Sequence, residues 1–333
     1  MLLPLIGGTD ALLLVLLALI VDAALGDSPL FDRFVFSPGR AAARASAWFD
    51  RRLNRIDRSD AVRQARGTLV LLAMAGGAFA IGYAAALAGR SMKLGFLIEL
   101  LLVVRCLSVR WPYARLETVR AALASGGVEA GRAAVAPLTG RQLWSLDQHG
   151  VVRAALEGTA KALNQRLVAP LFWYALLGLP GLLTWTVVDA LDATVGHPDP
   201  RHARFGRAAA VADDLMNWLP ARLTALLLAL AALFVPKVRP ALAWRTAVRD
   251  AALHPSRNTG WPLAALAGAL DLSLGGPRRE GERVVKEPWI GQGRARALTG
   301  DLRRARALYA AASILTVLLL AGGTASVLAL TAP

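Results

Sequence analysis

Cysteine and histidine are scarce in this 333-residue chain, which contains one cysteine, Cys106, and four histidines. A single cysteine forms no intrachain disulfide and supports no multi-thiolate zinc site. The sequence also contains neither a G-x-x-x-x-G-K-[ST] phosphate-binding loop nor a G-x-S-x-G nucleophile elbow. These absences exclude disulfide-stapled secreted domains, zinc-thiolate proteins, P-loop enzymes and serine hydrolases of the elbow type.

Acidic residues are also few, because 23 Asp and Glu stand against 38 Lys and Arg, for a formal net charge of +15. A basic chain suggests nucleic acid as a partner. Here, however, 32 of the 38 basic residues fall in three polar segments between apolar blocks: 26–66, 105–166 and 237–306. The positive-inside rule gives cytoplasmic loops this composition, so we expect a multi-pass protein of the inner (plasma) membrane, with lipid and no nucleic acid as partners. Attraction to an anionic leaflet or substrate is a second interpretation.

Hydrophobic residues make up 56% of the chain, its mean hydropathy is +0.46, and the apolar residues are gathered in blocks. Spanning ~30 Å of hydrocarbon takes about 20 residues of helix, so the two shortest blocks are marginal. The chain is therefore predicted to be all-α, a polytopic membrane protein with 4–6 membrane-embedded segments in a single integral-membrane domain, 1–333. The apolar segments are 2–25, 67–89, 94–109, 167–190, 219–235 and 308–330.

Three segments need separate interpretation. The first block has no positively charged flank before it, so we expect a retained helix and not a cleavable signal peptide. The block 167–190 contains Gly178-Leu-Pro180-Gly181 at its centre, and it is either a span or a re-entrant hairpin. The polar insert 110–166 has apolar residues at helical spacing, whereas 255–293 is rich in Gly and Pro and is predicted to be an ordered irregular loop.

Two clusters of polar residues lie at the ends of apolar blocks. Asp22 and Asp27 flank the end of the first block, where a carboxylate is either functional or a solvated helix-end residue. Four carboxylates and an amide lie on the two sides of the short loop that follows the fourth block: Asp189, Asp192, Asp213, Asp214 and Asn217. Such a group suits Mg²⁺, but helix capping explains it equally well.

A third cluster lies in the Gly/Pro-rich segment 255–293. Gly276, Gly291 and Gly293 allow a close approach of the backbone to a ligand. Trp261 and Trp289 are flat surfaces that either anchor the protein at the membrane interface or stack against a ligand.

Six stretches occur in an order that is specific when taken together: LGDSP at 25–29, VAPLFWYALLGLPG at 168–181, LDATVG at 191–196, ADDLMNWLPARLT at 212–224, HPSRNTGWPLAALAGALDLSLGGP at 254–277 and EPWIGQG at 287–293. In these stretches the chain resembles the adenosylcobinamide-phosphate synthase family of cobalamin biosynthesis. The resemblance extends over essentially the whole length.

The resemblance implies an activity and a set of site residues. Members of that family are polytopic inner-membrane proteins that join aminopropanol, or its O-phosphate, to a propionate carboxyl of adenosylcobyric acid. The step consumes ATP and needs Mg²⁺, and association with other corrinoid-pathway membrane enzymes is expected. On this basis Glu157 and Asp192 are expected to be catalytic, and the metal ligands are Asp192, Asp213 and Asp214. The predicted substrate-binding residues are Asp22, Asp27, Asn217, Asn258, Trp261, Lys286 and Trp289.

The chain departs from the family pattern at several polar positions. Family members read close to ESVAENLSDGVVAP where this chain reads EGTAKALNQRLVAP, so Glu157 is kept while Lys161 replaces a glutamate. Glu287 stands where the family has lysine, with Lys286 one place earlier. Two hypotheses follow: Lys161 and Glu287 exchange charges as partners, or the chain is a repurposed homologue that binds a corrinoid or a protein without catalysis.

Overall fold

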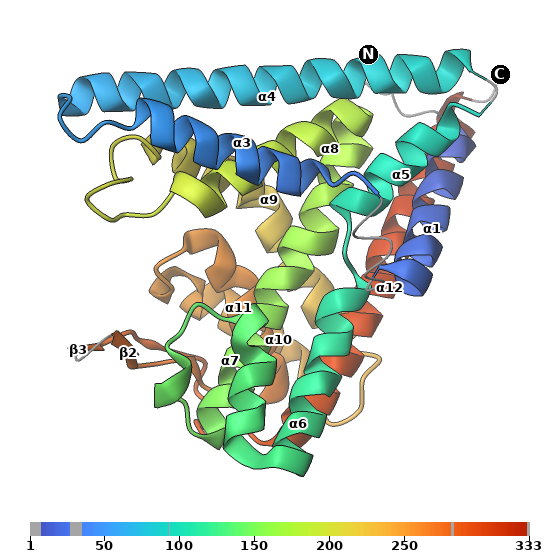
Figure 1. Ribbon diagram of the computed structural model, residues 1–333. Coiled ribbons are helices and arrows are strands. Elements are labelled where there is room, and N and C mark those ends of the chain that lie inside the picture. The colour runs from blue at the N-terminus through green and yellow to red at the C-terminus, as the bar shows by residue number, and fades with distance from the viewer. Residues whose placement is uncertain (1–7, 27–34, 93, 281–282, 332–333) are drawn as a thin grey trace. The chain divides into compact units, whose positions relative to one another are not determined.

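The structure is a computed structural model that describes residues 8–26, 35–92, 94–280 and 283–331 (Figure 1). Asp27, a predicted substrate-binding residue, lies outside these described residues. Nearly all regular structure is helical, and the strands are two to three residues long, so the prediction of an all-α protein is confirmed. The main helices are α1 (Gly8–Leu25), α3 (Pro38–Leu53), α4 (Asp60–Ser91), α5 (Phe96–Cys106), α6 (Arg110–Val135), α7 (Gln148–Leu163), α8 (Ala169–Val195), α9 (Arg207–Ala231), α10 (Pro240–Asp250), α11 (Arg257–Leu270) and α12 (Thr299–Thr331).

The chain forms two compact units that alternate along the sequence. Unit 1 contains Met1–Ser108, Ala169–Trp218 and Leu320–Pro333, and unit 2 contains Val109–Val168 and Leu219–Leu319. Each unit therefore joins segments that are distant in the sequence. The single domain expected over 1–333 stays a prediction.

Three helices in the described part of the chain are long and apolar enough to cross a membrane: Asp60–Gly89, Gln148–Val195 and Thr299–Gly323. Leu13–Leu25 is a shorter apolar helix. In the described residues, each of the six predicted apolar segments coincides for most of its length with a helix. Neither α5 nor α9 is among the candidate spans, and these two helices carry the two segments that were predicted to be marginally long. An all-α membrane protein is the class that this architecture defines.

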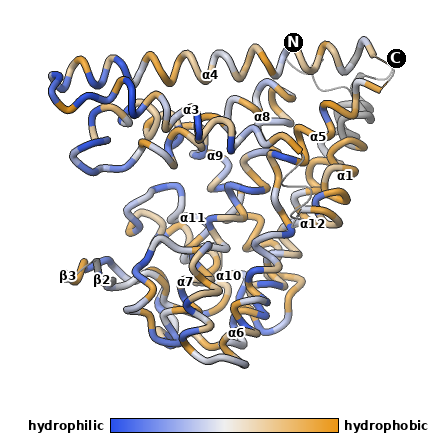
Figure 2. Tube along the Cα trace, viewed as in Figure 1, coloured by the Kyte–Doolittle hydropathy of each residue, from blue (hydrophilic) through white to orange (hydrophobic). Residues whose placement is uncertain are grey.

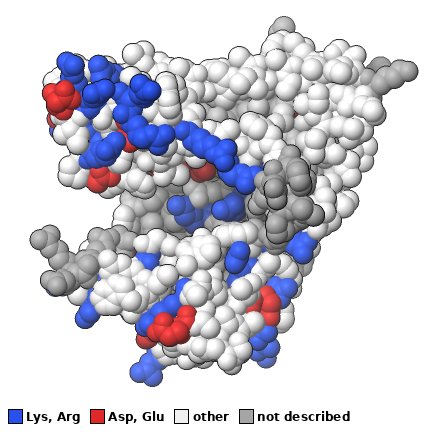
Figure 3. Space-filling model, in the orientation of Figure 1, with Lys and Arg blue, Asp and Glu red and all other residues white. Residues whose placement is uncertain are grey.

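In unit 1, the first residues of α4 are polar and the residues that follow form the apolar segment expected over 67–89. Ser59 caps it by accepting a hydrogen bond from the Val62 amide at 3.4 Å. Figure 2 shows α4 hydrophobic over most of its length, with hydrophilic residues at the end that meets α3. Lys and Arg side chains gather at that same end in Figure 3, and residues 67–89 of the helix include no charged residue. Basic residues beside an apolar helix suit a membrane–water boundary.

A buried polar network fixes the turn between α3 and α4. Asn54 donates through Nδ2 to Asp50 Oδ1 at 2.8 Å and to the Arg201 carbonyl at 2.9 Å. Arg63 donates through Nε to Asn54 Oδ1 at 3.2 Å. The Arg201 guanidinium lies 2.9 Å from Asp50 Oδ2. Because these groups satisfy one another, the loop that contains Arg201 is held against α3 without an unpaired buried charge.

The Gly-Leu-Pro-Gly sequence, for which the sequence left a span and a re-entrant hairpin open, lies at a kink within α8. Gly178 has φ 66° and ψ −154°, which is outside the helical region, and Pro180 follows within the next turn. The chain is helical on both sides of the kink, and α8 packs against α3 and α4. Its second half ends in a small core in which Leu191 and Val195 contact Phe205 and Val70.

Unit 2 is built around α7, which leads through a π-helical turn, Asn164–Val168, into α8. The helical insert expected over 110–166 is confirmed, and α6 within it is broken at Gly127, where φ is 65°. Unit 2 also contains two short antiparallel strand pairs: β1 (Leu274–Gly275) with β4 (Trp289–Ile290), and β2 (Arg278–Glu280) with β3 (Arg283–Val285).

The prediction of an irregular loop over 255–293 is wrong for its first half, where α11 forms a buried helix. Ser256 caps α11 by accepting from the Thr259 amide at 3.3 Å, and every residue from Pro262 to Leu270 is buried. Gly260 and Gly268 are needed for close packing, because a Cβ there would lie 2.0 Å from the Ala251 carbonyl oxygen and 2.4 Å from that of Leu242. Burial against α10 therefore outweighs the low helix propensity of Gly and Pro.

Candidate functional site

Glu157 on α7 is the centre of the candidate site in unit 2. Its Oε1 accepts a hydrogen bond from the Gly275 backbone amide at 2.8 Å, and its Oε2 lies 2.8 Å from Arg141 Nη2. Both side chains are largely buried, with 16% of Glu157 and 14% of Arg141 exposed. Each carboxylate oxygen therefore has one fixed donor and one lone pair left for a substrate.

Close backbone approaches hold Glu157 in this position. Gly158 lets α7 approach the loop that carries Arg141, because a Cβ there would lie 2.2 Å from the Leu138 carbonyl oxygen. On the other side, Gly275 pairs with Trp289 in the β1–β4 ladder and has φ 74°, a conformation that favours glycine. A Cβ at Gly276 would lie 2.6 Å from the Trp289 ring, so the indole packs directly on the Gly-Gly turn.

Cationic and aromatic groups surround this carboxylate. Arg153 lies one turn of α7 before Glu157 and places its guanidinium 5.5 Å from the centre of the Trp289 ring. Its Nη1 donates to the Ala295 carbonyl at 2.9 Å. Trp289 is 41% exposed, so one part of the indole packs on protein and the other part can contact a ligand.

His254 adds a titratable group to the cluster. Its Nδ1 lies 2.9 Å from the Ser256 carbonyl oxygen and 3.0 Å from the Ser256 amide nitrogen. Burial lowers the pKa of His254 below its usual 6.5, the charges of Lys161 and Arg141 lower that pKa further, and the charge of Glu287 opposes them. The imidazole is therefore neutral at neutral pH, and both substituted positions, Lys161 and Glu287, act electrostatically on the same ring.

The first turns of α11 form a second part of the site in unit 2. Asn258 is 7% exposed and belongs to the first turn. Trp261 is half-buried, with the Arg222 guanidinium 4.9 Å from its ring centre and Trp244 6.4 Å away. Lys286 is exposed on the strand-rich segment that leads to Trp289. Five predicted site residues, Glu157, Asn258, Trp261, Lys286 and Trp289, therefore belong to unit 2.

The other described site residues belong to unit 1. Asp22 is 2% exposed, so it is not the solvated helix-end residue of the alternative interpretation. Asn217 is also 2% exposed and donates through Nδ2 to Asp213 Oδ1 at 2.9 Å. Asp192 is half-buried near the end of α8, and Asp214 is exposed on α9. Their assignment to substrate binding or catalysis stays a prediction.

The predicted metal ligands do not form a cluster of the kind that holds a cation. Across the described ranges there is no group of three or more His, Cys, Asp or Glu side chains that could bind a metal ion. Asp213 uses one oxygen to accept from Asn217, four residues along the same helix. The residues present therefore do not fit a resident Mg²⁺ held by Asp192, Asp213 and Asp214, and no step below depends on one.

Sequence reasoning missed three residues of the Glu157 cluster: Arg141, Arg153 and His254. His254 begins the HPSRN stretch, so it could have been identified from its place in that motif. Arg153 could have been found, because it lies four residues before Glu157 on the same helix. Arg141 carries no local signal, because its ion pair with Glu157 depends on how a separate loop folds against α7.

The fold and this site define an α-helical membrane protein with a buried carboxylate among cations and indoles. The chain matches the CobD/Cbib protein family over residues 15–309, and it belongs to that family. It is 40% identical to the cobalamin biosynthesis protein CobD of Sinorhizobium sp over 304 residues, 90% of this chain and 93% of the relative.

Two further relatives support the same assignment. The chain is 38% identical to the cobalamin biosynthesis protein CobD of Rhizobium meliloti strain 1021, covering 92% of this chain and 95% of the relative. It is also 38% identical to the cobalamin biosynthesis protein CobD of Rhodobacter capsulatus, covering 89% of this chain and 92% of the relative. No solved structure matches the chain. These relatives confirm the family predicted from the six stretches, and with it a role in cobalamin biosynthesis.

Proposed function

We propose that this protein forms the amide bond between a propionate carboxyl of adenosylcobyric acid and aminopropanol or its O-phosphate, at the expense of ATP. The observation that carries the proposal is Glu157, a carboxylate fixed by Arg141 and Gly275 inside a cationic cluster. Amide formation needs an activated carboxyl, a deprotonated amine and neutralised phosphate charge. Mg²⁺ enters this scheme as part of the ATP substrate complex.

Each group of the cluster has a part in this scheme. Glu157 accepts a proton from the ammonium of the amino alcohol, since an amine must lose a proton before it attacks an acyl group. Arg153 and Lys161 lie on the same helix, and their positive charges suit phosphate or carboxylate groups of the substrates. Trp261 and Trp289 offer flat surfaces for the corrinoid.

The location that we propose is the inner membrane, with the basic segments on the cytoplasmic side, where ATP is available. A multi-pass arrangement would use the three long apolar helices and the shorter α1. Association with other membrane enzymes of the corrinoid pathway is part of the same proposal, because a large substrate released into the cell would be diluted.

Product formation tests the proposal directly. The detergent-purified protein is supplied with adenosylcobyric acid, aminopropanol O-phosphate, ATP and Mg²⁺, and the corrinoid is followed by mass spectrometry. We expect the mass of the amide product. If a folded protein gives no product while a relative run in parallel does, the second candidate applies: a homologue that binds a corrinoid or a protein partner, which the substitutions at Lys161 and Glu287 favour.

The charge-exchange hypothesis gives a separate prediction at His254. Lys161→Glu should raise the pKa of His254, Glu287→Lys should lower it, and the double variant should return it toward the wild-type value, because both charges act on this imidazole. NMR titration of the His254 imidazole measures these shifts. We expect about a tenfold loss of rate in each single variant and recovery in the double variant. Additive losses without recovery would show that the two residues are not coupled.

A further inference from the structure

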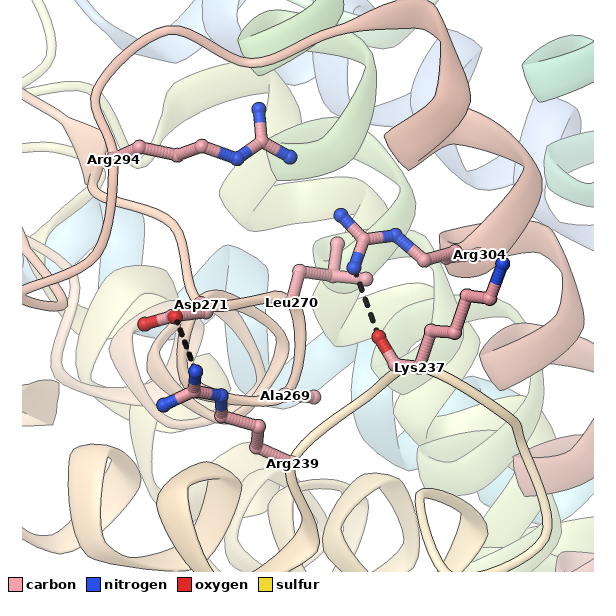
Figure 4. A pocket seen from close by; sticks show the side chains of 7 residues that line it. All are labelled: Lys237, Arg239, Ala269, Leu270, Asp271, Arg294 and Arg304. Carbon is pink, nitrogen blue, oxygen red and sulfur yellow. Dashed lines mark hydrogen bonds and ion pairs between the residues drawn. The ribbon is translucent and has the colours of Figure 1, made fainter.

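A basic cavity lies in unit 2, formed by residues other than those of the Glu157 cluster. Its volume is about 260 Å³, and it is lined by Lys237, Arg239, Ala269, Leu270, Asp271, Arg294 and Arg304 (Figure 4). Four of the seven lining residues are cationic and one is acidic. The cavity is below the roughly 300 Å³ of a small drug site, so it suits a compact anionic group and not a corrinoid.

The cations that line this cavity converge from different elements, which are tied to one another. Arg304 on α12 donates through Nη1 to the Lys237 carbonyl at 2.9 Å, in the connection between α9 and α10. Arg239 donates its amide to the Ala269 carbonyl at 2.9 Å, and Arg294 donates its amide to the Asp271 carbonyl at 3.2 Å. Figure 4 shows the Arg294 and Arg304 side chains approaching from separate segments. The cavity is therefore a built feature of the fold.

The carboxylates nearby do not neutralise the cavity. Asp301 is 1% exposed and accepts from both Arg294 and Arg304, which fixes the two guanidinium groups from one side. Arg239 lies 3.3 Å from Asp271, and both side chains are exposed. Within the described part of the chain, no carboxylate forms an ion pair with the Lys237 ammonium. Three of the four cations have guanidinium forks, which suit phosphate oxygens.

Lys237 itself has an unusual backbone conformation. Its φ is 62°, and it is one of two non-glycine residues with positive φ in the described chain. A left-handed conformation costs a residue with a side chain about 1 kcal/mol or more. This cost is accepted at a residue that lines the cavity and whose carbonyl accepts the Arg304 hydrogen bond.

The surroundings of the cavity favour a lipid as the source of the anion. Lys237 lies six residues after the end of α9 at Ala231, in a connection where Leu233 is 64% exposed and Phe234 72% exposed. Arg304 lies in the first turns of the candidate span Thr299–Gly323, which further along exposes Ile314 (60%) and Leu318 (59%). Apolar surface of this kind belongs in hydrocarbon, so the cations lie at the depth of the headgroups.

We propose that this cavity binds the phosphate group of an acidic phospholipid. The shared chemistry is a phosphate ester, and a soluble phosphate is the other possible source. In the lipid arrangement the headgroup phosphate contacts Lys237, Arg239 and Arg304, and the acyl chains lie along the exposed apolar side chains of α9 and α12. The inference is independent of the amide-forming reaction.

The test uses a double variant, Lys237→Gly with Arg239→Gln, in the full chain. Glycine accepts φ 62° without strain, and the Arg239 pair with Asp271 is an exposed ion pair of little worth, so both changes should leave the fold intact. Arg303→Gln is the control, since it removes one exposed cation from α12, next to Arg304 in sequence but not among the residues that line the cavity. Thermal unfolding of all three proteins checks the fold.

Native mass spectrometry in detergent then compares bound dioleoyl phosphatidylglycerol with dioleoyl phosphatidylcholine. We expect wild type and Arg303→Gln to prefer phosphatidylglycerol. The double variant should bind this lipid about 20-fold more weakly, because each cation near the surface contributes about fivefold to the affinity. Competition with millimolar inorganic phosphate separates the sources. If the lipid stays bound, the site is a headgroup site. If phosphate displaces the lipid, and the double variant no longer binds inorganic phosphate, the site belongs to a soluble phosphate and the lipid proposal is overturned. Equal lipid binding by all three proteins overturns the site itself.

Discussion

Replacing Glu157 with glutamine should lower the rate of amide formation by about 100-fold or more, because a positioned general base contributes at least that factor. Glutamine keeps the size of the side chain and an acceptor for the Gly275 amide, but it cannot take up a proton. The measurement is the initial rate of corrinoid amide formation by mass spectrometry, at saturating ATP and amino alcohol. KM for the amino alcohol should change less than kcat.

Glu129→Gln is the matched control for this substitution. Glu129 is in unit 2 on α6, and its side chain is 83% exposed and pairs only with Arg132 among the described contacts. Its replacement should leave the rate unchanged. A Glu157→Gln protein that unfolds at the wild-type temperature and reacts at the wild-type rate would remove Glu157 from the reaction.

Replacing Gly291 with alanine should destabilise the protein by roughly 3 kcal/mol. Gly291 has φ 90°, and a Cβ there would lie 2.2 Å from the Leu272 carbonyl oxygen. The left-handed conformation costs about 1–2 kcal/mol for a residue with a Cβ, and overpacking against backbone adds a similar amount. The Gly291 amide also donates to Asp250 Oδ2 at 2.9 Å, so a shift of this turn would break a buried hydrogen bond. Thermal unfolding in detergent measures the loss.

Gly300 provides the control for Gly291. It lies in the first turn of α12, and a Cβ there would meet nothing within 4 Å. Gly300→Ala should therefore be neutral or should stabilise the protein by up to about 1 kcal/mol, since alanine is the better helix former. Equal unfolding temperatures for Gly291→Ala and wild type would mean that the turn relaxes freely and does not define the β1–β4 ladder.

The helices of this protein could be predicted from the sequence because the membrane imposes a strong pattern. Blocks such as 67–89 and 308–330 leave few alternatives to a helix. Gly178, Pro180 and Gly181 marked the centre of the fourth block as irregular, and the kink lies there, but the sequence left a span and a hairpin both open. By contrast, α11 was missed because Gly260, Pro262 and Gly268 are typical of a loop, whereas the structure uses both glycines for contact with neighbouring backbone. Packing of this kind has no local signature.

Some residues of the candidate site could likewise be predicted from the sequence, and others could not. Glu157 and Trp289 were identified from motif stretches, and the fold places both beside the Gly275–Gly276 turn. Arg141 could not be found, because its pairing with Glu157 depends on how a loop folds against α7. The predicted metal ligands Asp213 and Asp214 are adjacent in sequence, but neighbouring helix positions point in different directions, and among the described residues no group of three or more metal-binding side chains forms around them.

The interleaving of the two units has a consequence for biosynthesis. Gly275, which holds the carboxylate of Glu157, is made 118 residues after it. At about 5–20 residues per second, the ribosome completes this partner roughly 6–24 s later. During that interval α7 has been made and the apolar α8 has followed it, so Glu157 exists before the backbone amide that donates to it. The order of translation thus makes synthesis of α8 precede assembly of the site.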